Sequence, residues 1–271
     1  MQKYSTEEVI QFLINDKLLI PKKEFITSQA KENKKQGLFY MLTGNINIFD
    51  QRGNLVKIYS TDEEKEWREI MQMYRFSMQF KSIKINMILE SLITKRKISL
   101  ETIHKYMKEN TWISHTFAFS LANSQSITYT FYNIIYILLK EYFHLFEKQL
   151  KHNNLTSLDV FMFIDSLTLK FEGLIRELFS INNYPTFILN NDTGTAFEKD
   201  LNALLHDENI KNFLDEDELL FYKYLFIEQE GINLRNRIAH SLFFEQEYDM
   251  GLANLLFIAL LRLFKFIIEN K

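Results

Sequence analysis

The sequence contains no cysteine and very little proline or glycine. The absence of cysteine excludes disulfide bonds and thiolate metal sites, and it fits a protein of the reducing cytoplasm. Only 2 prolines and 7 glycines occur in 271 residues, so few residues interrupt a helix. Hydrophobic residues make up 46% of the chain and aromatic residues 15%, enough to bury a sizeable core. We therefore expect long helices, arranged in one large or two small domains.

Neither end of the chain predicts a membrane protein. The first residues, Met-Gln-Lys-Tyr-Ser-Thr-Glu-Glu, lack the apolar segment of a signal peptide, and we expect a cytoplasmic protein. Residues 252–268 are almost continuous in Leu, Ile and Phe, so a membrane span has to be considered. Arg262 and Lys265 would each cost a few kcal/mol near the centre of a bilayer. We expect this helix to lie between its own bundle and a second subunit, which favours a homodimer.

The charge is distributed unevenly over a chain whose net charge is −3. Residues 156–271 carry 10 Lys and Arg against 19 Asp and Glu, whereas residues 1–155 carry 22 against 16. If the partner is RNA, the N-terminal part is therefore the more favourable part of the chain to contact it. The alternative is that these charges belong to solvated helix faces.

The apolar spacing predicts a mainly all-α protein with one small β-hairpin. Alternation on both sides of a turn predicts the hairpin at about 38–60. The polar stretch 153–157 predicts a boundary between a helical accessory region, 1–155, and a helical domain, 156–271. Helices are expected after the caps Ser5, Thr61 and Ser99 and after Pro21, and over 127–152, 158–180 and 252–268. Residues 182–195 are expected to form a loop that lines a substrate entrance or simply connects helices.

The chemistry of the chain is concentrated in Gly231-Ile-Asn-Leu-Arg-Asn-Arg-Ile-Ala-His240. Asn236 and His240 share one face of a helix, whereas Arg235 lies about 140° away from His240 around the axis. A guanidinium holds phosphate oxygens, an imidazole moves protons near neutral pH, and an amide orients either of them. The trio therefore suits chemistry on a phosphodiester without a metal. The alternative is a surface helix with three solvated side chains.

This block resembles the Arg-Asn-x-x-x-His motif of the HEPN superfamily, whose helical domains occur in many bacterial toxin, abortive-infection and CRISPR proteins. Gly-x-Asn-Leu-Arg-Asn-x-x-x-His after the acidic, aromatic helix 215–230 is similar to a group of uncharacterised bacterial HEPN proteins, and the likeness covers about 157–271. Glu172 and Arg176 resemble a pair on an earlier helix of that group. They form an i,i+4 ion pair at the surface or hold the catalytic groups in place. The group usually has glycine after the histidine, where this chain has Ser241.

The resemblance implies a HEPN-type helical bundle with metal-independent endoribonuclease activity. His240 would assist attack of the ribose 2′-hydroxyl on the phosphate, leaving a 2′,3′-cyclic phosphate. Arg235 would stabilise the extra charge, and Asn236 would position His240 or the phosphate. Such domains pair so that Arg and His face one another across a dimer interface, and the 140° offset suits such a composite site. The other histidines lack the spacing of a metal cluster, and there is no Gly-rich phosphate loop, so no metal or cofactor is expected.

The biological role implied is that of a toxin or an antiphage-defence effector that acts on RNA. Two other hypotheses remain open. In the first, the domain is a non-catalytic nucleotide-binding or scaffold subunit of a defence complex, which the acidic C-terminal half favours. In the second, the enzyme is silent until an antitoxin or a nucleotidyltransferase partner releases it. The RNA target and the trigger are not encoded in any motif of the chain.

Overall fold

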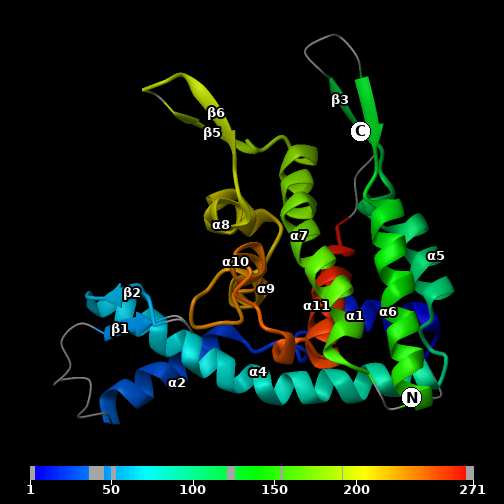
Figure 1. Ribbon diagram of the computed structural model, residues 1–271, viewed down its shortest axis with the longest axis horizontal. Coiled ribbons are helices and arrows are strands. Elements are labelled where there is room, and N and C mark those ends of the chain that lie inside the picture. Colours follow the sequence, from blue (N-terminus) through cyan, green and yellow to red (C-terminus); the bar gives the residue numbers. More distant parts are fainter. Residues whose placement is uncertain are drawn as a thin grey trace.

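The computed structural model describes residues 4–36, 46–49, 53–120, 126–152, 155–190 and 192–266, and these are mainly helical, as the sequence predicts (Figure 1). The α-helices are α1 (Thr6–Asn15), α2 (Lys23–Gln36), α4 (Asp62–Thr94), α5 (Leu100–Asn110), α6 (Tyr132–His152), α7 (Ser157–Ile181), α8 (Leu201–His206), α9 (Glu216–Phe226), α10 (Leu234–Ala239) and α11 (Met250–Leu263). Three short 3-10 helices are η1 (Trp112–Ser114), η2 (Glu208–Asn212) and η3 (Glu245–Glu247).

Three of these helices begin where the sequence places their caps. The hydroxyls of Ser5, Thr61 and Ser99 each accept a hydrogen bond from the backbone N–H three residues later. The side chain at that third position in turn accepts a hydrogen bond from the N–H of the capping residue, which completes a capping box. The predicted beginnings of α1, α4 and α5 are therefore confirmed, and α2 follows Pro21 as expected.

The predicted hairpin at about 38–60 is present as β1 (Ile46–Phe49) and β2 (Leu55–Tyr59), which pair in antiparallel orientation. Part of its predicted turn, 50–52, lies outside the described residues, as does 38–45. The hairpin lies beside one end of α4 (Figure 1). Strand β2 leads directly into α4, and Tyr59 at its end is buried, so this short two-stranded sheet is packed against other parts of the chain.

A second hairpin corrects the predicted start of the helix over 127–152. Strands β3 (Phe117–Ser120) and β4 (Ser126–Tyr129) pair in antiparallel orientation, and α6 begins only at Tyr132. Phe117 pairs with Tyr129 across the strands, and their ring centroids lie 5.5 Å apart. Aromatic and β-branched residues favour such cross-strand contacts, and here they outweigh the helical spacing that continues from α6.

A third hairpin corrects the loop expected over 182–195. Strands β5 (Phe187–Asn190) and β6 (Thr195–Glu198) pair in antiparallel orientation and project away from the helices beyond the end of α7 (Figure 1). Gly194 has φ +67°, a conformation that glycine adopts without the steric cost of a Cβ atom. Phe187, Ile188 and Leu189 supply the β-forming residues, and all three side chains are exposed.

Helix α11 is covered by other parts of the same chain. It packs against α1, α4 and α7, and every one of its residues except Gly251 is buried. The helix predicted over 252–268 runs from Met250 to Leu263, and residues 267 and 268 lie outside the described part of the chain. The expectation that a second subunit covers this helix is wrong, because α1 and α4 of the same chain do so. None of the described helices has the length and apolarity needed to cross a membrane.

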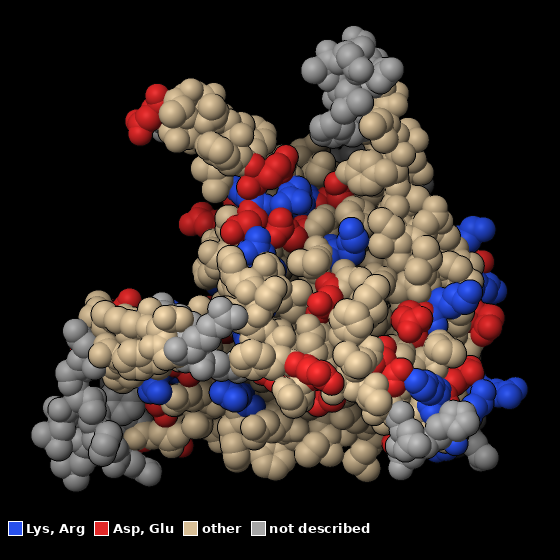
Figure 2. Space-filling view, viewed as in Figure 1, with Lys and Arg blue, Asp and Glu red and all other residues tan. Residues whose placement is uncertain are grey.

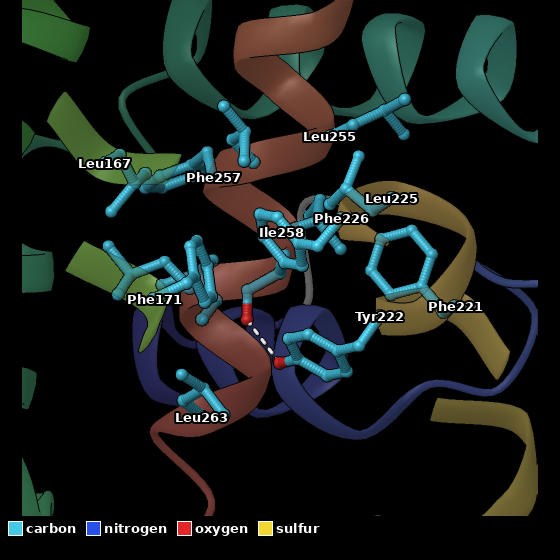
Figure 3. Close-up of a cluster of buried hydrophobic side chains, with 14 of the residues drawn as sticks. Leu167, Phe171, Phe221, Tyr222, Leu225, Phe226, Leu255, Phe257, Ile258 and Leu263 are labelled. Carbon is cyan, nitrogen blue, oxygen red and sulfur yellow. Dashed lines mark hydrogen bonds between the residues drawn. The ribbon is translucent and has the colours of Figure 1, made fainter. Parts of the chain in front are cut away.

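Side chains from α7, α9 and α11 form the part of the core that supports the motif (Figure 3). Phe171 of α7 lies with its ring centroid 4.5 Å from that of Phe226 of α9. The hydroxyl of Tyr222 donates a 2.7 Å hydrogen bond to the carbonyl of Ala259. Because buried aromatic rings make many contacts, this cluster holds the three helices in one arrangement.

Polar contacts also join residues on either side of the boundary predicted near 155. The guanidinium of Arg262 in α11 forms a buried 3.0 Å ion pair with Glu218 of α9 and donates to the carbonyl of Asp16 after α1. The indole N–H of Trp112 donates a 2.8 Å hydrogen bond to the carbonyl of Leu263. The buried hydrophobic residues of both segments form one cluster. The boundary itself stays a prediction.

Candidate functional site

The segment that precedes the motif turns back sharply on α9, which ends at Phe226 and not at 230 as expected. The N–H of Ile232 donates a 2.8 Å hydrogen bond to the carbonyl of Tyr224. A Cβ atom on Gly231 would lie 2.2 Å from that carbonyl oxygen, so the close approach of the two backbones requires glycine. The glycine of the motif thus has a backbone function.

Asn233 and Leu234 determine where the next helix, α10, begins. Asn233 has φ +56° and is buried, and asparagine is among the residues that tolerate this left-handed conformation best. The side chain of Leu234 is completely buried. Helix α10 therefore begins at a defined point against α7 and α9. The position of Leu234 also sets where the next two side chains, Arg235 and Asn236, leave the helix.

Arg235 is held by Glu172 of α7. Its Nε and Nη2 atoms donate to Oε2 of Glu172 at 3.4 and 3.2 Å, and Nη1 donates to Oδ1 of Asn236 at 3.2 Å. The amide group of Asn236 in turn donates to Oδ1 of Asn233 at 2.8 Å. The side chains of Arg235 and Glu172 are about one quarter exposed. The guanidinium is therefore oriented on both of its sides.

Glu172 also joins the expected i,i+4 pair to the chain around it. Its Oε1 accepts from Nη2 of Arg176 at 2.8 Å, and Oε2 accepts from the backbone N–H of Leu201 at 3.2 Å. Arg176 donates to the carbonyl of Lys199 and pairs with Glu198. Figure 2 shows Asp and Glu residues next to Lys and Arg residues on the surface below the β5–β6 hairpin. The pair at 172 and 176 thus forms the expected ion pair and contacts Arg235 as well.

His240 lies at the other end of α10, as its C-terminal capping residue, and it is exposed. With Asn236 it lines a cavity of about 570 Å³, and Arg235 is not among the residues around that cavity. No described residue forms a hydrogen bond with the imidazole ring. The structure thus brings Arg235 to Asn236, and Asn236 to His240, but it does not bring Arg235 and His240 together within one chain.

The chain after His240 is held by Arg237, whose role no spacing in the sequence indicated. Ser241, the residue directly after His240, has φ +54°. Arg237 contacts both carboxylate oxygens of Glu247, at 2.7 and 2.5 Å, and lies 4.7 Å from the ring centroid of Phe243. Both contacts come from Nη2 of Arg237, which also donates to the carbonyl of Leu242 at 3.3 Å, so Arg237 holds the loop that follows His240.

Two other parts of the chain reach the same cavity from the N-terminal half. Arg75 of α4 and Phe49 of β1 line it together with His240. They are separated from His240 by more than 160 residues, so no local spacing indicated them. The one feature of the sequence that pointed to this half of the chain was the net positive charge of residues 1–155.

Comparison with known proteins does not assign the chain to a family. No family model matches the chain, and no curated protein or solved structure matches it. Within the described ranges, no three His, Asp or Glu side chains are grouped so that they would hold a metal ion. Function therefore has to be inferred from the side chains of the site.

Proposed function

We propose that this protein is a metal-independent endoribonuclease of the HEPN type. The observation that carries the proposal is the chain of contacts from Glu172 through Arg235 to Asn236, which ends at a helix terminus where His240 is exposed to a cavity. A guanidinium oriented by a carboxylate and an accessible imidazole are the groups that phosphodiester cleavage needs.

In this reaction, His240 accepts the proton of a ribose 2′-hydroxyl as the 2′-oxygen attacks the adjacent phosphorus. The bond from phosphorus to the 5′-oxygen breaks, and the leaving oxygen takes a proton from water. The products are a 2′,3′-cyclic phosphate and a 5′-hydroxyl. Arg235 stabilises the additional negative charge of the phosphorane, and Asn236 orients the guanidinium.

The position of Arg235 favours a site completed by a second copy of the chain. Arg235 does not line the cavity of His240, and the resemblance implies that the two residues face one another between subunits. We therefore propose a homodimer. Light scattering at micromolar concentration tests it, and a monomer that cleaves RNA would contradict the shared site.

Cleavage of single-stranded RNA in the presence of EDTA tests the activity. We expect products with cyclic-phosphate ends from the purified protein and none from His240→Ala. His144→Ala, which removes an exposed histidine from α6, is the matched control and should cleave normally. Cleavage that requires Mg²⁺, or that survives in the folded His240→Ala variant, would remove the proposal.

Glu172 is a positioning residue in this proposal. Glu172→Gln weakens its contacts with both arginines, and we expect kcat to fall about 10- to 100-fold, the usual effect of losing an orienting partner, with KM nearly unchanged. Glu198→Gln removes a carboxylate that pairs with Arg176 and does not contact Arg235, and it should leave kcat unchanged. Equal effects of the two variants would argue against positioning.

The alternative of a non-catalytic nucleotide-binding or scaffold subunit is favoured by one observation. Several donors of Arg235 are engaged by Glu172 and Asn236, so the guanidinium is less available to a phosphate. An intact dimer that binds RNA or a nucleotide without cleaving either would support this alternative.

The proposed cellular role is that of a growth-arresting effector in antiphage defence or in a toxin–antitoxin pair. An antitoxin or a nucleotidyltransferase partner would then keep the enzyme silent. Expression in a bacterial host tests this role, because growth should stop with the unaltered chain and continue with His240→Ala. Equal growth in both cases, from an enzyme active in vitro, would favour control by a partner.

A further inference from the structure

The cavity beside His240 continues into a second one along α4. The second cavity has a volume of about 440 Å³. It shares with the first the lining residues Arg75, Gly231, Arg237 and Glu247. Its other walls include the polar side chains of Gln79, Ser82 and Asn86. The two cavities therefore form one groove, with His240 and Phe49 in one part and α4 along the other.

Arg75 brings a cation to this groove, which is also lined by Arg237 and by the acids Glu247 and Asp249. Asp249 lines the second cavity, where its carboxylate caps α11 by accepting a 2.7 Å hydrogen bond from the N–H of Leu252. Among the described residues that line the first cavity, Glu247 is the one acid, and its charge is compensated by Arg237 at 2.5 Å. Arg75 is exposed and forms no ion pair with any residue in the described part of the chain. A cation in this situation attracts an anion at little desolvation cost, and a phosphate group is the anion that Arg binds with several donors.

Phe49 supplies an aromatic surface at the same groove. It is the last residue of β1, and its side chain is 59% exposed although phenylalanine has no polar atom to hydrate. An exposed aromatic ring next to a cation is the combination on which single-stranded nucleic acids are held, because bases stack on the ring while the backbone meets the charge.

We propose that single-stranded RNA lies in this groove, with one base stacked on Phe49 and an adjacent phosphate bound by Arg75 next to His240. The proposal rests on the proposed function and names how its substrate is held. A single strand is required because the faces of bases in a duplex are already stacked on their neighbours. Both Phe49 and Arg75 come from residues 1–155, so the N-terminal half contributes substrate contacts that the motif of the C-terminal half lacks.

Binding can be measured separately from cleavage with a substrate that cannot react. A fluorescently labelled 2′-O-methyl RNA of about ten nucleotides, within the usual site size for single strands, lacks the attacking hydroxyl. Fluorescence anisotropy with the full chain gives its Kd at several salt concentrations. Circular dichroism confirms that each variant is folded.

Phe49→Ala should weaken binding of this RNA roughly five- to a hundredfold, the range found when a stacked base loses its aromatic partner. The matched control is Phe76→Ala, which removes a ring of the same exposure, 59%, from a position on α4 outside both cavities. The control should bind as the unaltered chain does.

Arg75→Gln should weaken binding and lower the slope of log Kd against log salt by about 0.7, the value for one phosphate contact on a single strand. Arg96→Gln is the matched control, because it makes the same change of net charge at an exposed residue after the end of α4. A general effect of net charge would appear equally in both variants and would overturn the assignment of Arg75.

Three results would overturn the groove. The first is that the unaltered chain does not bind the RNA. The second is that Phe49→Ala and Arg75→Gln bind it as tightly as their controls do. The third is that AMP displaces the RNA with the affinity of the oligonucleotide itself, which would indicate a mononucleotide site. If the unaltered chain does not cleave RNA but both variants lose binding, the proposed endoribonuclease activity is refuted and the proposed binding groove is supported. The two proposals are therefore tested separately.

Discussion

At the scale of residues, backbone conformation explains part of the motif. Gly231 is required by the nearby carbonyl of Tyr224, and Asn233 adopts a left-handed conformation. Ser241 adopts the same conformation although it carries a Cβ atom. The three residues lie on either side of Arg235 and His240, so backbone conformation helps to set where α10 begins and ends.

Replacing Ser241 by glycine should stabilise the protein. At φ +54° the side chain costs roughly 1 to 2 kcal/mol, of which the greater freedom of glycine in the unfolded chain offsets part. We expect the free energy of unfolding to rise by about 0.5 to 1 kcal/mol in urea titrations. Ser241→Ala keeps the Cβ atom and should give no gain, and a gain of equal size would refute the conformational explanation.

A pH effect is expected from Asp165, which accepts a 2.8 Å hydrogen bond from the hydroxyl of Tyr248. Burial raises the pKa of Asp165, and the hydrogen bond from Tyr248 opposes the rise. A raised pKa in the folded state contributes stability below the unfolded value of about 3.9, and this contribution is lost as the pH rises through the folded value.

Asp165→Asn removes this titration. The stability of the variant relative to the unaltered chain should therefore increase as the pH rises from the unfolded pKa of about 3.9 through the higher folded value. Urea titrations across this range measure it. Asp192→Asn, at an exposed turn between β5 and β6, is the comparison, and a parallel pH dependence of both variants would show that Asp165 is not the cause.

At the scale of elements, α11 is the helix around which the others are arranged. It contacts α1, α4 and α7, and in Figure 3 its side chains meet those of α7 and α9. Phe257 is completely buried and stacks on Tyr142 of α6, with ring centroids 4.2 Å apart. A helix of this kind is apolar on every side because a protein layer lies against each of its faces.

Phe257→Ala should lower the free energy of unfolding by about 3 to 5 kcal/mol, because it removes buried contacts and leaves a cavity. Phe76→Ala, at an exposed position of α4, should change it by about 0.5 kcal/mol or less. Urea titrations followed by circular dichroism give both values. A small effect at Phe257 would mean that this part of α11 is not buried as described.

At the scale of the whole molecule, the two segments divided near residue 155 depend on one another. Trp112 and Asp16 of the first segment bond to Leu263 and Arg262 of α11, and the core residues form one cluster. Helix α4 lies below α7 and α11 in the view of Figure 1. Separation would therefore expose the faces of α11 that α1 and α4 now cover.

Segment 156–271 expressed alone should consequently show no cooperative unfolding transition, whereas the full chain should unfold cooperatively. Exposing an apolar helix face removes a stabilisation of about 25 cal/mol for each Å². Circular dichroism during thermal unfolding measures this, and co-expression of segment 1–155 should restore the transition. Cooperative unfolding of the isolated segment would show that it is an independent domain with a boundary at 155.

The sequence by itself determined the features that depend on neighbouring residues. The caps at Ser5, Thr61 and Ser99, the hairpin of β1 and β2, and the position of Arg235, Asn236 and His240 on one short element all follow from local spacing. The hairpins β3–β4 and β5–β6 were missed because their short apolar stretches also fit a helix or a loop.

Only the tertiary structure decided which distant residues meet. It paired Arg235 with Glu172 and not with His240, and it brought Arg75 and Phe49 to the cavity of His240. It also covered α11 with α1 and α4, where the apolar pattern alone is equally typical of a subunit interface. Such contacts depend on how helices cross in space, and the periodicity of one helix indicates which of its faces is buried but not what covers that face.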